Sequence, residues 1–167
     1  MAVTTQEATE YTYLTSATPT TMYPDQYHGR VRSVKFNHTQ SGAGDATSSA
    51  ANAKLPAGRV RLLLAPSYAY VNWTTASATL DLGWDAYINA SDGATVAADP
   101  DGLVNGMDVD AVGLRNFSTG AVAALLLDGY EKVFESRTGV VIRATSQDTA
   151  IADGDDLCGR LFYIKED

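Results

Sequence analysis

The chain has 167 residues, of which 45% are hydrophobic, and its formal net charge at pH 7 is −8. That length fits one domain with a real core, and the negative charge argues against a general electrostatic attraction to nucleic acid. A single cysteine, Cys158, excludes an intrachain disulfide and a zinc site built from thiolates. No apolar run reaches the roughly 18 residues of a membrane span. The N-terminus lacks the basic start and apolar stretch of a signal peptide, so we expect synthesis and residence in a cytoplasm.

The first 29 residues differ from the rest, because they contain no Lys or Arg but nine Ser or Thr, four Tyr and two Pro. Such a segment has too little apolar mass for its own core and too many β-prone side chains for a solvated linker. We therefore interpret residues 1–26 as an extended arm that becomes ordered on the body of this chain or on a neighbouring subunit. Residues 27–167 are expected to form one β domain. Tyrosine can bury its ring and keep its hydroxyl paired, so the candidate partner-binding residues in and beside this arm are Tyr11, Tyr13, Tyr23 and Tyr27.

Several segments show the composition and alternation of β-strands between turn residues. They span residues 28–38, 58–65 (ended by Pro66), 79–88, 132–135, 139–144 and 157–165. Residues 40–53 are small and polar, which predicts a mobile loop or a strip ordered by a partner. Residues 92–120 predict no long element, with a short helical turn at 103–107, and residues 121–128 fit a strand or a helix. The pattern favours an all-β fold: an antiparallel β-sandwich or small barrel, jelly-roll-like, with at most one or two short helices.

A short internal echo opens two of these predicted strands, where Gly29–Arg32 and Gly58–Arg61 share the pattern Gly-Arg-Val-Arg. If the echo is structural, the arginines project from one face of neighbouring strands and form a positive strip on an acidic protein. They would either pair across strands with Asp81 or Asp85, or dock onto an acidic partner. On the second interpretation the candidate partner-binding residues are Arg30, Arg32, Arg59 and Arg61.

Few residues are suited to catalysis or cofactor binding. His28 and His38 are the only two histidines and lie ten residues apart on one predicted strand. The chain has no Gly-x-Ser-x-Gly nucleophile motif and no phosphate loop ending in Gly-Lys-Ser/Thr. We therefore predict that it is not an enzyme and has no catalytic residue or cofactor.

Two other patterns leave alternatives open. The oxygen donors of Asp99–Asp110 have spacings that suit Ca²⁺, but glycine is the fourth residue and no Glu is the twelfth, so a solvated acidic turn is the other interpretation. Tyr68, Tyr70 and Trp73 are spaced closely enough to form an aromatic surface that could stack on sugars. Alternatively they cover one end of the core or a subunit contact. A carbohydrate-binding or adhesin sandwich is therefore one alternative function.

A small β domain, an extended arm, loops rich in Ala, Thr, Gly and Asp, and no catalytic set together resemble the decoration (cement) proteins of tailed-bacteriophage capsids. The stretch Gly139–Asp155 is also similar in style to phage virion proteins. The similarity covers most of the chain but includes no diagnostic motif, so it assigns no residue roles.

The resemblance implies a non-enzymatic virion protein that is assembled in the host cytoplasm and lies on the capsid surface. Such a protein would stabilise the shell by bridging capsomers, with a terminal arm as the clamp. The implied partners are the major capsid protein and further copies of this chain, with a trimer favoured over a dimer, and neither nucleic acid nor a membrane. Another head–tail or tail component of a phage is the alternative.

Overall fold

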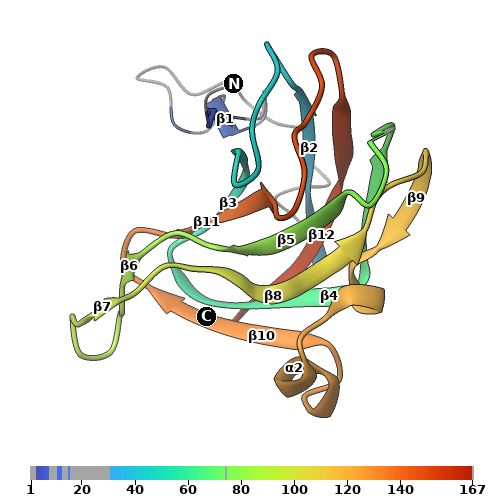
Figure 1. The fold of residues 1–167 in the computed structure, drawn as a ribbon. Coiled ribbons are helices and arrows are strands. Elements are labelled where there is room, and N and C mark those ends of the chain that lie inside the picture. The colour runs from blue at the N-terminus through green and yellow to red at the C-terminus, as the bar shows by residue number, and fades with distance from the viewer. Residues whose placement is uncertain (1–2, 8–10, 13–14, 16–30, 74, 167) are drawn as a thin grey trace.

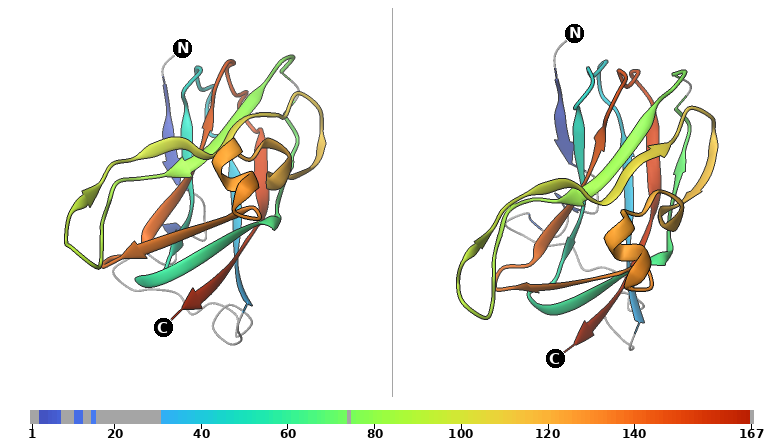
Figure 2. Two further views of the ribbon diagram at one scale, coloured as in Figure 1. Left: turned by 90° about the horizontal axis from the view of Figure 1, so that it is seen from below. Right: turned by 60° about the horizontal axis from the view of Figure 1, so that its bottom comes forward.

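The computed structural model describes residues 3–7, 11–12, 15, 31–73 and 75–166. Two β-sheets pack against each other as a sandwich (Figure 1), so the predicted all-β sandwich is confirmed. A 3₁₀ turn, a short helix and a small hairpin are attached to it, and the described arm residues 11, 12 and 15 are helical as well. Figure 2 shows the hairpin extending from one side of the sandwich, and the helix lying at the surface.

The strands, in chain order, are β1 (Thr5–Glu7), β2 (Val31–Thr39), β3 (Ser49–Leu55), β4 (Gly58–Val71), β5 (Thr79–Trp84), β6 (Tyr87–Ile88), β7 (Thr95–Val96), β8 (Asp99–Asp108), β9 (Gly113–Asn116), β10 (Glu131–Ser136), β11 (Val140–Ser146) and β12 (Asp156–Glu166). The first sheet has the order β1-β3-β11-β5-β8. The second has the order β10-β4-β12-β2, with β9 paired to β4, and β6 and β7 form the hairpin. A 3₁₀ turn, η2 (Phe117–Gly120), and the helix α2 (Ala123–Leu127) connect β9 to β10.

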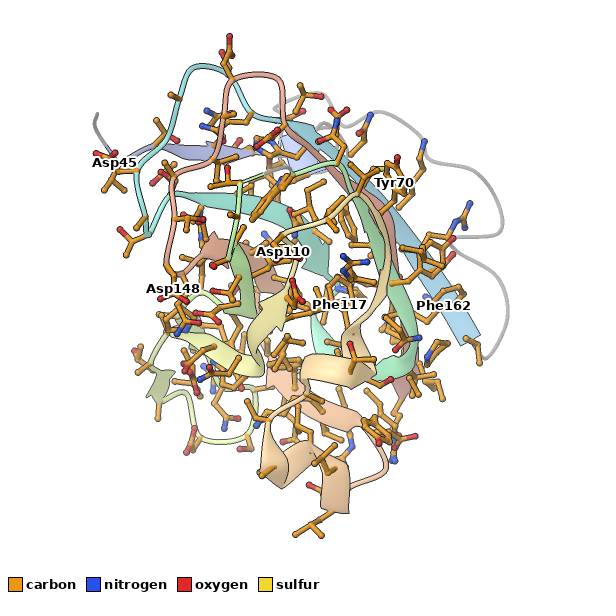
Figure 3. All side chains as sticks on the ribbon, turned by 45° about the vertical axis from the view of Figure 1, so that its right-hand side comes forward. Asp45, Tyr70, Asp110, Phe117, Asp148 and Phe162 are labelled. Carbon is orange, nitrogen blue, oxygen red and sulfur yellow. The ribbon has the colours of Figure 1, made fainter. Side chains whose placement is uncertain are left out.

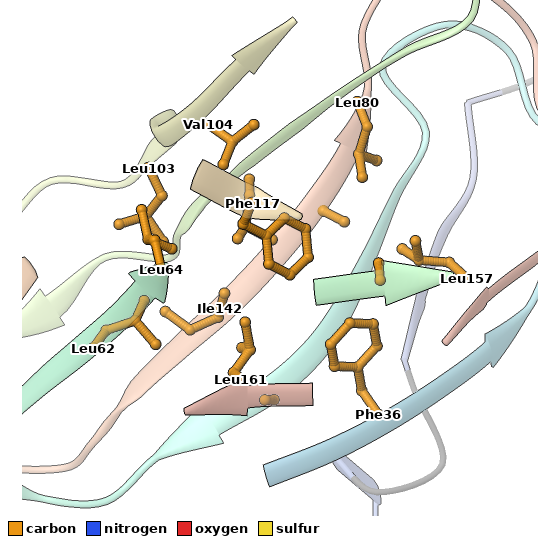
Figure 4. Packing of buried hydrophobic residues seen from close by; sticks show 14 of the residues in the cluster. Phe36, Leu62, Leu64, Leu80, Leu103, Val104, Phe117, Ile142, Leu157 and Leu161 are labelled. Atoms are coloured by element: carbon orange, nitrogen blue, oxygen red, sulfur yellow. The ribbon is translucent and has the colours of Figure 1, made fainter. Parts of the chain in front are cut away.

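The core lies between the two sheets and follows the two-residue period of the strands. Along β11, for example, Val140, Ile142, Ala144 and Ser146 are buried while the residues between them are partly exposed. Figure 4 shows Ile142 close to Leu62 and Leu161 of the other sheet. The predicted strands at 132–135, 139–144 and 157–165 are thus confirmed as parts of β10, β11 and β12.

The prediction of a mobile loop over residues 40–53 is wrong for its second half, which belongs to β3. This strand lies inside the first sheet between β1 and β11. Ala51, Asn52 and Ala53 have no exposed surface at all. Small side chains give no hydrophobic pattern in the sequence, but here both faces of the strand are covered and small residues fit.

Strand β4 does not stop at Pro66, as predicted, but continues to Val71 through a bulge. The register with β12 shifts there, so that Leu63 is opposite Phe162 whereas Tyr68 is opposite Arg160. The hydroxyl of Ser67 accepts a hydrogen bond from the Phe162 backbone N–H at 2.9 Å. Pro66 lies in this bulge, between the paired residues Leu63 and Tyr68, so its missing N–H breaks no ladder hydrogen bond with β12.

The region after residue 78 also differs in detail from the prediction. The strand predicted at 79–88 is divided into β5 and β6. The helical turn predicted at 103–107 is wrong, because these residues form the second half of β8, with Leu103 and Val104 both buried. Of the two alternatives at 121–128, the helix is found, as α2.

Candidate interaction surfaces

The first described residues of the predicted arm lie on the body of their own chain. Strand β1 pairs in parallel with β3, with Thr5 opposite Ser49. Beside it, the Thr4 backbone N–H donates to the Ser48 hydroxyl at 3.0 Å, and Gln40 Nε2 donates to the Thr4 hydroxyl at 2.9 Å. This end of the arm therefore completes an edge of the first sheet.

Tyr11 is the one predicted arm tyrosine within the described residues, and it packs, partly buried, against the hydrophobic core. Burial raises the pKa of its hydroxyl, the negative charges of Glu7 and Asp85 raise it further, and Arg143 opposes them. Arg143 itself binds Asp85 with two hydrogen bonds of 2.7 and 2.8 Å. Tyr13, Tyr23, Tyr27 and Arg30 lie outside the described residues, so their partner-binding role stays a prediction.

Arg59 and Arg61 form a network of ion pairs on the second sheet. Arg59 pairs with Glu135 of β10 and, at 2.6 Å, with Glu166 of β12. Arg61 pairs with Glu131 at 2.7 Å and with Glu166 at 2.6 Å. Hydrogen bonds from both arginines lower the pKa of Glu166. Cross-strand pairing therefore occurs, but the predicted partners Asp81 and Asp85 are wrong.

Arg32 does not join Arg59 and Arg61 in a positive strip, because strand β12 lies between β2 and β4. In this register, Tyr163 of β12 is opposite both Arg32 and Leu62, whereas Ile164 is opposite both Val31 and Arg61. Successive residues of a strand point to opposite faces. Arg32 therefore lies on the face opposite to Arg61, and the expected strip is wrong for Arg32.

The candidate metal and catalytic positions are dispersed or buried. His38 is only 8% exposed, and burial lowers its pKa, against the opposing effects of Gln40 and Asp156. His28 lies outside the described residues. Asp99–Asp108 is strand β8, in which Asp99 and Asp101 lie near each other at one end and Asp108 lies at the other end, so the three carboxylates do not converge on one ion. Within the described ranges, no group of three or more His, Cys, Asp or Glu side chains is placed to hold a metal ion.

The three residues of the predicted sugar-binding surface do not share one face. Trp73 is 4% exposed and belongs to the core, whereas Tyr70 is 42% exposed. Trp73 thus covers the core, which was the other interpretation of this pattern. Figure 3 shows Tyr70 near the end of the second sheet.

Among the described residues, five of the seven large exposed apolar side chains lie in two places, and the other two are Val3 and Val31. At the β4–β9 ladder, Tyr70 is opposite Leu114, which is 65% exposed. Val112, two residues before Leu114, is 54% exposed. On α2, Leu126 is 46% exposed and Leu127 is 90% exposed. The sequence carries one signal for the second place, since residues 116–127 contain no charged side chain. This signal does not distinguish a buried segment from an exposed one, because an apolar run has the same composition in both cases. None of the described helices is long and apolar enough to span a membrane.

Two solved structures share this fold. A chain of the capsid of Ralstonia phage GP4 superposes with a TM-score of 0.65 and 18% identity, over 100% of this chain and 99% of that one. A chain of the cyanophage Pam1 capsid asymmetric unit superposes with a TM-score of 0.51 and 14% identity, over 90% and 96% of the two chains. No family model matches the sequence, and no curated protein matches it either. At these identities the likeness is one of fold.

Proposed function

We propose that this chain is a non-enzymatic structural protein of a tailed-phage virion that binds the outside of the capsid and stabilises the shell by bridging capsomers. The observation that carries the proposal is the fold match along the whole chain to a chain of the GP4 capsid, together with the match to a chain of the Pam1 capsid. We propose the major capsid protein as its partner and a trimer as its form.

The described surface is consistent with a role in assembly. The candidate catalytic and metal positions are buried or dispersed, whereas α2 and the β4–β9 ladder present leucine and tyrosine side chains to solvent. Large contiguous patches of exposed apolar residues are rare on monomeric proteins, and where they occur they often mark contact surfaces. A contact that spans two capsomers must break before they separate, and many weak contacts add up across a lattice.

The test is binding of purified protein to capsids that lack it. We expect hundreds of copies per particle in a sedimentation assay, and a higher temperature of capsid rupture for the decorated particles. Absence of binding would overturn the proposal. A copy number between six and a few dozen would overturn the decoration role and point instead to a head–tail or tail component.

The role of the arm is tested with two truncations. Deletion of residues 1–26 should abolish binding to particles while circular dichroism still shows a folded β domain. Deletion of residues 1–7 alone is the matched control, because it removes β1 and its contacts with β3 and leaves the rest of the arm. Equal loss of binding by both truncations would assign the effect to the missing sheet edge and contradict a clamp formed by residues 8–26.

A further inference from the structure

We propose that helix α2 is a contact between copies of this chain, in which Leu126 and Leu127 of one copy enter the groove beside α2 of the next. The inference deepens the proposed function, because it names the surface that would join the subunits of the proposed trimer. The contact itself can be tested on purified protein, without any capsid.

The first argument is the exposure of α2. Leu125 is 3% exposed and anchors the helix in the core, but Leu126 and Leu127 point away from it, and Ala123 and Ala124 are also exposed. Burying one leucine side chain is worth about 1.5–3 kcal/mol. The protein has 32 charged side chains, yet none of them lies in residues 116–127. An exposed apolar run of this kind is expected where a partner covers it.

The second argument is that the helix is held in place at both ends. A five-residue helix is too short to be stable alone. The Val122 backbone N–H donates to the Leu103 carbonyl at 3.1 Å, and the Tyr130 N–H donates to the Leu125 carbonyl at 2.7 Å. Gly129 and Tyr130 close the turn with φ values of 69° and 63°. A left-handed backbone conformation is energetically unfavourable for tyrosine, so it is found where the surrounding contacts hold the backbone in place. A pre-organised apolar element loses little entropy on binding.

The third argument is a groove of about 410 Å³ next to the helix. Its apolar wall is formed by Ala124, Leu125 and Val133, and its charged rim is formed by Arg61, Asp128, Glu131 and Lys132. Pockets of about 300–1,000 Å³ hold ligands larger than one side chain, so the groove has room for both exposed leucines of a neighbour. Figure 1 shows α2 beside β10, the strand that supplies the other wall.

A second copy is the occupant that these features favour. Ala124 and Leu125 belong both to the helix and to the groove, so each copy presents the two complementary surfaces side by side. If successive copies are related by a rotation axis, the same contact repeats around a closed ring, and the groove of every copy holds the leucines of its neighbour. Asp128 directly follows Leu127, and entry of Leu127 brings this carboxylate toward the neighbour's Lys132, which has the opposite charge. Arg61 on the same rim is already paired with Glu131 and Glu166 of its own chain.

The size of the contact predicts its strength. Two leucines and two alanines cover much less than the roughly 800 Å² per partner of a standard interface. We therefore expect association of the free protein only at high micromolar concentrations and above.

The test is sedimentation of the full-length protein from low micromolar to millimolar concentration. Wild type should self-associate, and Leu127→Asp should weaken the association about tenfold or more. Leu114→Asp is the matched control, because Leu114 is also an exposed leucine but lies on β9. Circular dichroism verifies that both variants are folded. A wild type that stays monomeric throughout, or a Leu127→Asp variant that associates like Leu114→Asp, would overturn the inference.

A second measurement tests the pairing itself in a Cys158→Ser background. A mixture of the Leu127→Cys and Val133→Cys variants should form a disulfide-linked heterodimer under mild oxidation, whereas a mixture of Leu114→Cys and Val133→Cys should not. Equal cross-linking in both mixtures would contradict the proposed geometry.

The two proposals fail separately. If the protein binds capsids but its self-association does not depend on Leu127, this contact is wrong and the proposed function stands. If self-association depends on Leu127 but no capsid is bound, the contact stands and the proposed function is wrong.

Discussion

Strand β12 packs against its neighbours at a glycine that leaves no room for a methyl group. A Cβ atom added to Gly159 would lie 2.1 Å from the carbonyl oxygen of Tyr68 and 2.8 Å from Cα of Ala69. It would also lie 2.8 Å from the ring of Phe36, which is fully buried. The first two atoms are backbone atoms of β4, so they can give way only if β4 and β12 move apart. We therefore predict that Gly159→Ala destabilises the fold strongly.

The size of the effect follows from these contacts. Overpacking of a core costs about 1–3 kcal/mol, and moving the two strands apart weakens neighbouring ladder hydrogen bonds that are worth about 1 kcal/mol each. We expect a loss of about 4 kcal/mol in the free energy of unfolding, which few single substitutions reach. In urea denaturation followed by circular dichroism, with a slope of about 2 kcal/mol/M, the midpoint should fall by about 2 M.

Gly154→Ala is the control for this prediction. Gly154 has φ of 86° and nothing within 4 Å of an added Cβ, so its substitution carries only the backbone cost of about 1–2 kcal/mol. A loss for Gly159→Ala no larger than that for Gly154→Ala would refute the steric argument.

Three further predictions concern charged and titratable groups. A double-mutant cycle of Asp85→Asn and Arg143→Gln should give a coupling energy of about 1–2 kcal/mol in urea unfolding, because two hydrogen bonds of 2.7 and 2.8 Å join a partly shielded pair; zero coupling would show that the pair is idle. Burial lowers the pKa of His38, so the unfolded chain binds the proton first and stability falls as the pH drops below about 6.5 toward the folded-state pKa. His38→Gln should flatten this part of the stability–pH curve, and an unchanged slope would contradict the assignment. Glu166→Gln removes the shared partner of Arg59 and Arg61, so it should lower the melting temperature at low ionic strength and have little effect at about 1 M salt, where exposed charges are screened; a loss independent of salt would exclude an electrostatic cause.

The parts of the fold that could be predicted are those in which the side chains alternate between core and solvent. Strands β11 and β12 show this alternation, and they were located to within a few residues. Strand β3 could not be found in this way, because its alanines and Asn52 are buried on both faces and give no contrast. Proline usually indicates the end of a strand, but Pro66 lies in a bulge where β4 makes no ladder pair with β12, and the pairing resumes on both sides of it. Within the bulge, the Ser67 hydroxyl accepts the hydrogen bond of the Phe162 N–H.

The candidate surfaces were harder to predict, because they depend on pairing between distant parts of the chain. Arg59 and Arg61 were correctly expected to be able to pair across strands, but their glutamate partners lie 70 or more residues away, on β10 and β12. Only the strand order brings these together. In the same way, an apolar segment such as α2 does not reveal in the sequence whether another part of the chain covers it.

The glutamate at the end of β12 has a practical consequence for attaching cargo. Arg59 and Arg61 both form ion pairs with Glu166, which hold the last described residue of the strand in place. A tag or reporter peptide inserted after Glu166 would start from a residue that two ion pairs hold against the second sheet. Its orientation relative to the sandwich would then be defined by the length and stiffness of the linker alone.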